Sequence, residues 1–438
     1  MSSPAGGVGC CGSNCPESGR KPVSSGSASE KTTTSQGLSS LPREIWILGA
    51  GSFIVAVGMG IVAPALPAFA TSFDVGVTAA GFIVSAFAMM RLLFAPLSGR
   101  LVSAAGERTI YVIGITIVGI SSTACAFADS YWQLLIFRAL GGIGSTMFTV
   151  AGVGLLIRMS PPHLRGRASG VWATSFLLGN VSGPIVGGVM VGYSLRLPFV
   201  TYGIALFVAA FLGWFLLRKS TLAAPLGDDA TPSMPLGEAM RMRSYVASLL
   251  SNFGNGWAVF GVRIALVPLF VVEALKAPQS MSGIALSVFA IGNAGVLLLS
   301  GRMTDRHGRK PMVLIGLVVS GVATASLGFT TSVPVFLAAS LIAGMGAGVL
   351  NPAQNAAVAD IIGGNRRGGT VLATFQQAAD LGAILGPLIA GVLADTVSYQ
   401  AAFLVTGATA ALGLLAWVGA PETRPRPESG TEQVRAAA

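Results

Sequence analysis

Residues 300–316 read SGRMTDRHGRKPMVLIG and residues 98–114 read SGRLVSAAGERTIYVIG, so one block occurs twice, 202 positions apart. The opening serine, glycine and arginine, a later glycine and the closing Ile-Gly recur in both copies. Asp305 of the second copy is replaced by Ser103 in the first, and most of the charge around it is lost. The chain therefore contains two versions of one structural unit, and only one version keeps its acid.

Composition places this repeated unit in a membrane. Of the 438 residues, 53% are hydrophobic and only 10% are charged, with a mean hydropathy of +0.73. Soluble domains carry about 25% charged residues, whereas this chain repeats apolar runs close to the roughly 20 residues that cross a bilayer. We expect an all-α membrane protein with twelve transmembrane helices, at about residues 45–70, 75–99, 109–128, 131–157, 167–193, 197–217, 245–272, 279–300, 311–330, 333–358, 369–394 and 399–419.

The basic residues set the expected topology. With the N-terminus in the cytoplasm, 22 of the 27 Lys and Arg fall on cytoplasmic segments, as the positive-inside rule requires. Both ends are therefore expected in the cytoplasm, with the chain crossing the cell (inner) membrane and contacting its lipid bilayer. The net charge of +10 follows from this asymmetry, so no binding of nucleic acid is expected.

The repeat extends well beyond the opening block. RALGGIGS (138–145) aligns with SLIAGMGA (340–347), and GNVSGPIVGG (179–188) aligns with GAILGPLIAG (382–391). Parallel repeats of this kind are typical of transporters that rock two bundles around a central site. We expect two pseudo-symmetric six-helix bundles at 45–217 and 245–419, a cytoplasmic linker at 218–244, a disordered cytoplasmic tail at 1–44 and a second cytoplasmic tail at 420–438.

These motifs resemble those of the major facilitator superfamily, over roughly residues 45–420. GRMTDRHGRK (301–310) is similar to the family signature after the second helix of each bundle, and GRLVSAAGER (99–108) keeps its glycines without the acid. GNVSGPIVGG and GIVAPALP (60–67) resemble motifs of the drug:proton antiporter branch. The resemblance implies the major facilitator fold and a secondary transporter that works as a monomer on a small-molecule substrate, with protons as coupling ion.

The resemblance also implies that the two signature loops latch the bundles together on the cytoplasmic side. An acid there can accept hydrogen bonds from the start of a helix in the other bundle. We expect Asp305 to approach Arg165–Arg167 and Ser103 to approach Thr370; the alternative is a plain turn that carries topogenic charge. The loop residues are Gly99, Arg100, Ser103, Gly106, Arg108, Gly301, Arg302, Asp305, Arg306, Gly308, Arg309 and Lys310.

Two stretches combine glycine with proline inside a transmembrane helix. Proline bends a helix, and a row of glycines lets another helix approach closely. We interpret both stretches as moving helix interfaces, with static packing as the alternative. Their residues are Gly179, Gly183, Pro184, Gly187 and Gly188 in the first bundle, and Gly382, Gly386, Pro387 and Gly391 in the second.

Charged residues inside the membrane are the strongest candidates for a functional site. Arg91 lies eight residues before Gly99, and Asp380 lies eleven residues after Gly369. At a rise of 1.5 Å per residue, Arg91 lies about 12 Å and Asp380 about 16 Å from the cytoplasmic end of its helix. The two depths agree within one helical turn. The family architecture places their helices side by side, so we expect an ion pair between the bundles. It serves either as the proton-coupling site or as a static structural pair.

For several other polar residues the sequence allows two roles. We expect Gln376 and Gln377 to supply hydrogen bonds to Asp380, and Arg263 to snorkel from the outer end of its helix. Arg138 either binds substrate or ties loop carbonyls. Two asparagines of the seventh helix, and one at the repeat position of Arg91, either line a cavity or join helices: Asn252, Asn255 and Asn293.

The cysteines are not expected to form a metal site, although three clustered thiols that bind a thiophilic metal are the alternative. Cys10, Cys11 and Cys15 cluster without a fourth ligand at finger spacing, so we interpret them as reduced bystander thiols and expect no metal or cofactor. Cys125 is predicted to be an apolar core residue.

Several function classes are excluded or disfavoured by the residues themselves. His163 and His307 lie in separate loops without clustered acids, so an enzyme is not expected. The chain has no GxxxxGK[ST] loop for an ATP motor. A channel fits the twofold repeat poorly, and a receptor has no positive sign. The sequence therefore favours proton-coupled efflux of a drug-like molecule or metabolite, with proton-coupled uptake of a metabolite as the alternative.

Overall fold

The computed structural model describes residues 41–160, 164–218, 234–363, 366 and 368–424. Cys10, Cys11 and Cys15 lie outside these residues. In the described part of the chain, twelve helices are long and apolar enough to cross a membrane, which confirms the predicted number. The all-helical fold class is confirmed as well.

The first bundle consists of six spans. Its first span is broken at Pro64 into two helices, since proline cannot donate a helical hydrogen bond. The elements are α1 (Arg43–Val62), α2 (Ala65–Thr71), α3 (Val77–Ala105), α4 (Glu107–Ala126), α5 (Tyr131–Met159), α6 (Arg165–Val191) and α7 (Leu197–Leu217).

The second bundle repeats this order after a short helix, α8, that lies in the stretch expected to be a linker. Its first span contains a π-helical turn, η3, between two α-helices. The elements are α8 (Leu236–Arg241), α9 (Arg243–Asn255), η3 (Gly256–Val262), α10 (Arg263–Glu273), α11 (Ser280–His307), α12 (Arg309–Leu327), α13 (Val333–Ile362), α14 (Gly369–Thr396) and α15 (Tyr399–Val418).

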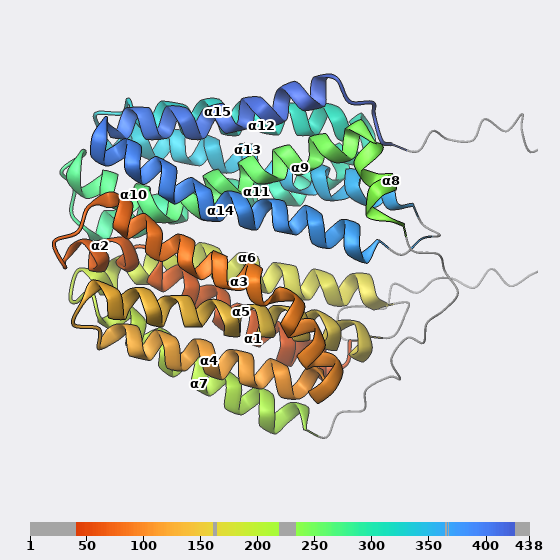
Figure 1. The fold of residues 1–438 in the computed structure, drawn as a ribbon, viewed down its shortest axis with the longest axis horizontal. Coiled ribbons are helices and arrows are strands. Elements are labelled where there is room, and N and C mark those ends of the chain that lie inside the picture. Colours follow the sequence, from red (N-terminus) through yellow and green to blue (C-terminus); the bar gives the residue numbers. More distant parts are fainter. Residues whose placement is uncertain (1–40, 161–163, 219–233, 364–365, 367, 425–438) are drawn as a thin grey trace, which may run out of the picture. The chain divides into compact units, whose positions relative to one another are not determined.

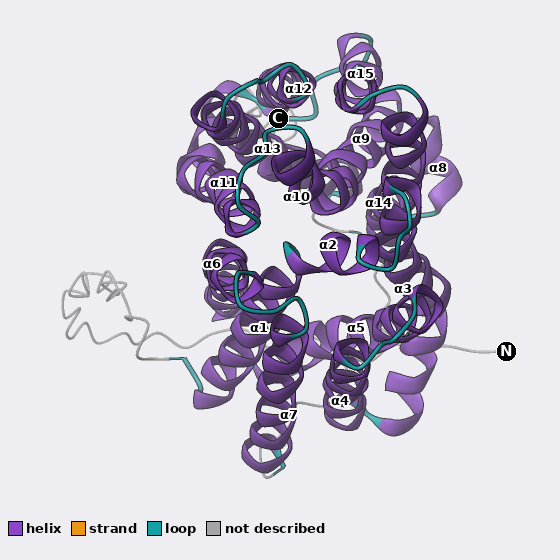
Figure 2. Ribbon diagram, turned by 90° about the vertical axis from the view of Figure 1, so that its left-hand side faces the viewer, coloured by secondary structure: helices purple, strands orange, loops and turns teal. Residues whose placement is uncertain are grey.

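The two bundles lie side by side with their helices roughly parallel (Figure 1). Viewed nearly along the helices, α1 and α3 to α7 form one group, α9 to α15 form the other, and α2 crosses between them (Figure 2). Because the spans are even in number, Arg43 and the turns at Gly106 and Gly308 share one end of the bundles with Arg424. We call this end the basic face, and the other end the opposite face.

The signature loops are helix ends rather than loops, which corrects the sequence interpretation. Helix α3 continues to Ala105 and α11 to His307, and each following helix begins after one residue. That residue is Gly106 or Gly308, with φ of 80° and 97°. Glycine adopts such angles without the strain of a side chain. Ser103 and Asp305 therefore sit on the last helical turn.

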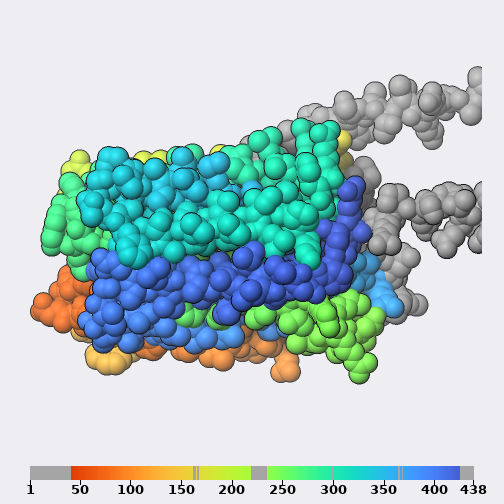
Figure 3. Space-filling model, turned by 90° about the horizontal axis from the view of Figure 1, so that it is seen from above, coloured from red at the N-terminus to blue at the C-terminus, as the bar shows by residue number. Residues whose placement is uncertain are grey.

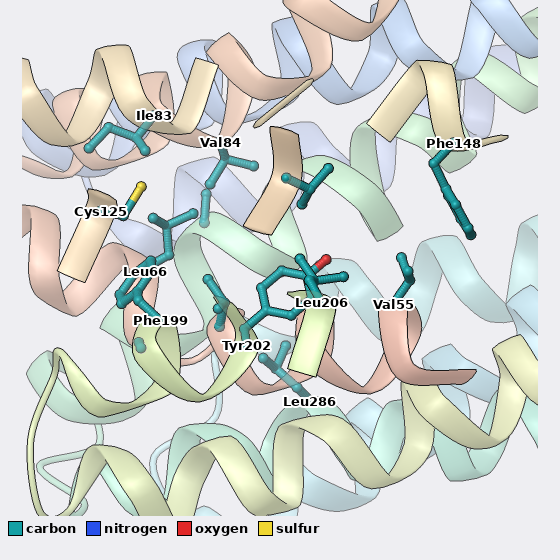
Figure 4. Packing of buried hydrophobic residues seen from close by; sticks show 14 of the residues in the cluster. Val55, Leu66, Ile83, Val84, Cys125, Phe148, Phe199, Tyr202, Leu206 and Leu286 are labelled. Atoms are coloured by element: carbon teal, nitrogen blue, oxygen red, sulfur yellow. The ribbon is translucent and has the colours of Figure 1, made fainter. Parts of the chain in front are cut away.

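Apolar side chains fill the interior of each bundle and also cover its outside. Cys125 is buried among them, as predicted; Figure 4 draws it in one cluster with Leu66 and Phe199. Helices of the second bundle, teal and blue, form most of the face drawn in Figure 3. Exposed large side chains such as Val322 and Leu415 belong to these helices. A lipid-facing surface needs such side chains.

At the basic face an ion pair joins equivalent helices in each bundle, and these two pairs have opposite polarity. In the first bundle Arg158 of α5 binds Glu107 of α4, with 2.5 Å between Nη1 and Oε2. In the second, Arg309 of α12 binds Asp360 of α13, with 2.7 Å between Nε and Oδ2. Both positions are related by the 202-residue repeat. The pair is therefore retained between equivalent helices although its charges have exchanged places.

We expect Arg309→Glu to place two acids in contact and to lower the free energy of unfolding by about 3 kcal/mol, the usual cost of breaking a largely buried pair. Adding Asp360→Arg reproduces the polarity of the first bundle and restores most of the loss. Unfolding of the purified protein, followed by intrinsic fluorescence, measures both. Arg43→Glu is the control. Because Arg43 is exposed and pairs only with its neighbour Glu44 among the described residues, this substitution should change the free energy of unfolding by less than about 1 kcal/mol. A double variant no more stable than Arg309→Glu contradicts the assignment.

Candidate transport site between the two bundles

The bundles meet along two seams that are related by the repeat. One seam joins α3 to α14, and the other joins α11 to α6. A Cβ added to Gly81 of α3 would lie 2.6 Å from the carbonyl oxygen of Pro387, and one added to Gly283 of α11 would lie 2.1 Å from that of Pro184. Neither distance leaves room for a side chain. Each seam therefore depends on a glycine against a proline carbonyl.

A second pair of glycines tightens both seams toward the opposite face. A Cβ on Gly391 would lie 2.8 Å from Cα of Thr78, and one on Gly188 would lie 2.6 Å from the carbonyl oxygen of Ser280. These two glycines are equivalent in the repeat and both face the other bundle. Gly188 and Gly391, which belong to the two predicted kinked stretches, therefore lie in contact with the other bundle.

The remaining glycines of the two kinked stretches pack inside their own bundle. Gly179, Gly183 and Gly187 of α6 contact α1, and Gly382 and Gly386 of α14 contact α9 and η3. A Cβ on Gly187, for example, would lie 2.2 Å from the carbonyl oxygen of Ile61. These glycines hold α1 and the seventh span close to the seam helices. The predicted motion at the seams remains a prediction.

Toward the basic face the same four helices have open space beside them. A Cβ added to Gly99 of α3, Gly369 of α14, Gly301 of α11 or Gly170 of α6 would meet no atom within 4 Å. The seams are therefore closed toward the opposite face, and open space lies beside these four glycines toward the basic face.

Asp395 fastens one of the seams and was missed by the sequence analysis. Its carboxylate accepts hydrogen bonds from the backbone N–H groups of Val77 (2.9 Å) and Thr78 (2.8 Å) and from Oγ1 of Thr78 (2.6 Å). An acid at the start of α3 satisfies unpaired amides and complements the helix dipole. The signal was available, because Asp395 is an acid near the end of a span on the face where α3 begins.

Arg91 and Asp380 lie further along the same seam, where the sequence placed them. Nη2 of Arg91 and Oδ1 of Asp380 are 3.9 Å apart, which confirms the predicted ion pair between the bundles. Both side chains are partly exposed, at 27% and 19%. The pair is therefore loose and accessible, unlike the two tight pairs at the basic face.

The predicted companions of Asp380 are not all brought to it. Gln376 and Gln377 are exposed, and among the described residues neither is seen to donate a hydrogen bond to Asp380. Asn293 is half-buried on α11, and its backbone contacts Gly344 and Gly348 of α13. The polar site therefore centres on the ion pair itself.

The asparagines of α9 join helices. Nδ2 of Asn252 donates to the carbonyl of Phe375 in α14 (2.7 Å), and Nδ2 of Asn255 donates to Oδ1 of Asn351 in α13 (3.0 Å). Because buried amides need such partners, these contacts show that the asparagines connect helices. A role in binding substrate stays a prediction.

Two arginines are buried deeper than the sequence suggested. The guanidinium of Arg138 lies over the ring of Phe87, 4.2 Å from its centroid. Arg263 is 5% exposed and lies 3.6 Å from the centroid of Phe289. The expectation that Arg263 snorkels is wrong, because the side chain turns into the bundle rather than out to the membrane surface.

The expected latch contacts are not formed in this conformation. Asp305 is mostly exposed and pairs with Arg309 (3.4 Å), four residues further along. Ser103 Oγ donates to the carbonyl of Gly99 (3.1 Å) on its own helix. Latching to α6 and α14 therefore stays a prediction for a conformation with a closed basic face. Of the other signature side chains, Arg108 donates to the carbonyl of Arg218 (3.4 Å).

A different contact holds the signature turn of the second bundle. The carboxylate of Glu422, beyond α15, accepts the N–H groups of Arg309 (2.9 Å) and Lys310 (3.0 Å) at the start of α12. Nζ of Lys310 donates to the carbonyls of Val418 and Ala420. The first residues of the expected cytoplasmic tail therefore bind this turn, and we call this contact the C-terminal clasp.

The chain aligns with a known family over nearly all of these elements. The model of the Major Facilitator Superfamily matches residues 48–262 and 248–438. The chain belongs to the major facilitator superfamily. Its members are membrane transporters and not enzymes, so this protein is a multi-pass membrane transporter of small molecules.

Relatives within the superfamily align over most of their length. The chain is 25% identical over 364 residues to the quinolone resistance protein NorA of Staphylococcus aureus, covering 81% of this chain and 90% of the relative. It is 25% identical to the multi-drug resistance efflux pump PmrA homolog of Lactococcus lactis (83% and 91% covered). It is 23% identical to multidrug resistance protein 2 of Bacillus subtilis (84% and 92% covered).

Solved structures share the fold. A bacterial homolog of the human lysosomal transporter Spinster, in an inward-facing and unoccupied conformation, matches with a TM-score of 0.70 and 17% identity, covering 86% of this chain and 95% of that one. A D-xylose-proton symporter matches with a TM-score of 0.72 and 18% identity, covering 87% and 98%. These likenesses confirm the major facilitator fold of the two bundles.

Asp395→Ala should loosen the seam toward the opposite face. Loss of the helix cap weakens the closed conformation by about 1 kcal/mol, which is roughly a fivefold shift in population. Spin labels on exposed Phe127 and Val397, one in each bundle at this face, report the change as a longer distance. The native cysteines are replaced first. Asp129→Ala, which removes an exposed acid at the same face, leaves the distance distribution unchanged. An unchanged distance distribution in Asp395→Ala contradicts the role of the Asp395 cap in holding this seam closed.

The C-terminal clasp should open in acid. Burial alone would raise the pKa of Glu422, but backbone N–H groups, led by that of Arg309, outweigh it and lower the pKa. A lowered pKa means that the clasp contributes stability above the unfolded pKa of the acid, and loses it as the pH falls through the folded pKa. The protection of the Arg309 and Lys310 amides against hydrogen exchange, relative to the intrinsic rate at each pH, should fall over that range. In Glu422→Gln this pH dependence disappears, whereas Glu238→Gln retains it; equal profiles in all three proteins contradict the clasp.

Proposed function

We propose that the protein is a proton-coupled exporter of small drug-like molecules. Curated relatives of similar length support this proposal, because their names describe quinolone resistance, multidrug resistance and multi-drug efflux. These names favour export as the direction of transport. The loose ion pair between Arg91 and Asp380 is the observation that carries the coupling to protons.

The proposed coupling site lies on the seam that must open for transport. Asp380 belongs to α14 and Arg91 to α3, so any rocking of the bundles changes the distance between them. While they are close, each charge has a partner; when the seam parts, a carboxylate left in the membrane favours taking up a proton. Because both side chains are partly exposed, protons and cargo have access to them.

The orientation, location and oligomeric state belong to the same proposal. The positive-inside rule assigns the basic face to the cytoplasm. The described conformation is then open toward the cytoplasm, ready to take up a molecule for export. We place the protein in the cell membrane with both ends cytoplasmic, and the complete pair of bundles in one chain supports a functional monomer.

Export is tested in everted membrane vesicles that contain the protein, with an imposed pH gradient. The expected result is uptake of ethidium and of a quinolone into vesicles with an acidic lumen, driven by protons that leave the lumen in exchange and abolished by a protonophore. Accumulation only in right-side-out vesicles would indicate uptake instead of export, and no gradient dependence in either orientation would contradict the proposal.

Asp380→Asn should lower the rate of transport driven by the pH gradient at least tenfold, because an amide cannot take up and release a proton. Counterflow of labelled against unlabelled substrate, which needs no net proton movement, should persist. Asp129→Asn is the control. It removes an exposed acid at the opposite face and should keep both activities.

The alternative, a static structural pair, predicts a different outcome. In that case Asp380→Asn lowers stability, and exchanging the charges with Arg91→Asp and Asp380→Arg restores both stability and transport. Full proton-driven transport by Asp380→Asn excludes this acid as the coupling site.

A further inference from the structure

Arg263 is buried without a counterion. Its side chain is 5% exposed, and its Nε and Nη1 atoms have no hydrogen-bond partner among the described residues. No acid in the described ranges forms an ion pair with Arg263. Its guanidinium makes a cation–π contact with the ring of Phe289. A desolvated guanidinium is costly unless it is paired and hydrogen-bonded. The contact with an aromatic ring offsets only part of that cost.

The repeat shows that this position for a guanidinium is retained. Phe289 and Phe87 are 202 residues apart, and each carries an arginine over its ring. In the first bundle that arginine is Arg138 of α5, but its repeat partner in the second bundle is Ser340. In the second bundle the guanidinium comes instead from α10. The equivalent phenylalanine rings of the two bundles therefore each contact an arginine, but the two arginines belong to helices that are not equivalent. Substitution at a single repeat position does not produce this arrangement.

The backbone around Arg263 is irregular and lies beside the other bundle. Arg263 is the first residue of α10, directly after the π-helical turn η3. Such turns occur frequently at functional sites. A Cβ on Gly261 would lie 2.8 Å from Cδ of Pro387, the proline of the seam. Helix α10 also contacts α2 and α3 of the first bundle.

We propose that Arg263 binds the carboxylate of an anionic aromatic or amphipathic substrate. The planar guanidinium offers a bidentate pair of N–H donors that matches a carboxylate, and two of its nitrogens are unpartnered. Phe289 holds the plane of the guanidinium and adds an aromatic surface beside it. The exporter thereby accepts organic acids and zwitterions, and the substrate carboxylate supplies the missing counterion. This inference rests on the proposed export function and names one substrate class of that site.

The test compares acids with their neutral esters. Nalidixic acid, naproxen and their methyl esters are titrated into the purified full-length protein in lipid nanodiscs, with calorimetric detection. The wild type should bind at least one acid tenfold or more tightly than its ester. Arg263→Gln should weaken binding of that acid at least tenfold and binding of the ester less than twofold.

Further variants separate recognition from packing. Arg263→Lys keeps the charge but not the bidentate geometry, so its affinity for the acid should fall between those of the wild type and Arg263→Gln. Arg196→Gln, at an exposed arginine of the opposite face, should match the wild type. Equal wild-type affinity for acid and ester in both chemical pairs overturns the proposal. An equal loss of both ligands in Arg263→Gln also overturns it. If Arg263→Gln does not fold, the wild-type comparison and Arg263→Lys decide.

Failure of this inference is distinguishable from failure of the proposed function. Ethidium has no carboxylate, so its proton-driven export by the wild type tests the export function independently of Arg263. Export of ethidium together with no preference for acid over ester rejects the Arg263 site alone. Absence of any gradient-dependent export rejects the proposed function, whatever the binding data show.

Discussion

At two crossings between the bundles, a glycine of one bundle lies against the carbonyl of a proline in the other. Gly81 faces Pro387, and Gly283 faces Pro184. Without a Cβ, the helix backbones approach as closely as their atoms permit, and the missing ladder hydrogen bond at proline leaves each helix bent there. Such a contact has no interlocking side chains, so it can close tightly and still part as a unit. The closed opposite face and the open basic face both follow from where these crossings lie along the helices.

The polar contacts that act on this frame are unequally distributed between the seams. Helices α3 and α14 share the Asp395 cap, the Arg91–Asp380 pair and a hydrogen bond from Ser85 to the carbonyl of Ile384. Among the described residues, none of the side-chain hydrogen bonds joins α6 to α11. The seam between α3 and α14 therefore carries charged and polar contacts, whereas the seam between α6 and α11 is made of close backbone contacts at glycines. This asymmetry parallels the loss of the acid in the first signature turn.

Length, hydropathy and repeats predicted twelve spans and two bundles because burial in lipid constrains every residue of a span. The Arg91–Asp380 pair was predicted because counting residues gives depth and the family resemblance implies that the two helices are neighbours. Counting does not give the rotation of a helix, so the snorkelling of Arg263 was wrong and the hydrogen bonds from Gln376 and Gln377 to Asp380 were not found. Asp395 and Glu422 cap helix starts that are distant in sequence, and the identity of such partners depends on tertiary packing. The continuation of α3 and α11 through the signature depends on positive φ at single glycines, which the composition of a loop does not reveal.

Transport is expected to require that the seam between α3 and α14 opens at the opposite face. Oγ1 of Thr78 and Oδ2 of Asp395 are 2.6 Å apart across it, so cysteines at both positions, in a chain without its native cysteines, can be joined by a short bifunctional methanethiosulfonate. The decisive measurement is substrate transport by this variant before cross-linking, after it, and after reduction. We expect that the cross-linked protein still binds substrate, that its transport is lost, and that reduction restores transport. Transport at the uncross-linked rate while the bridge is intact would contradict this expectation.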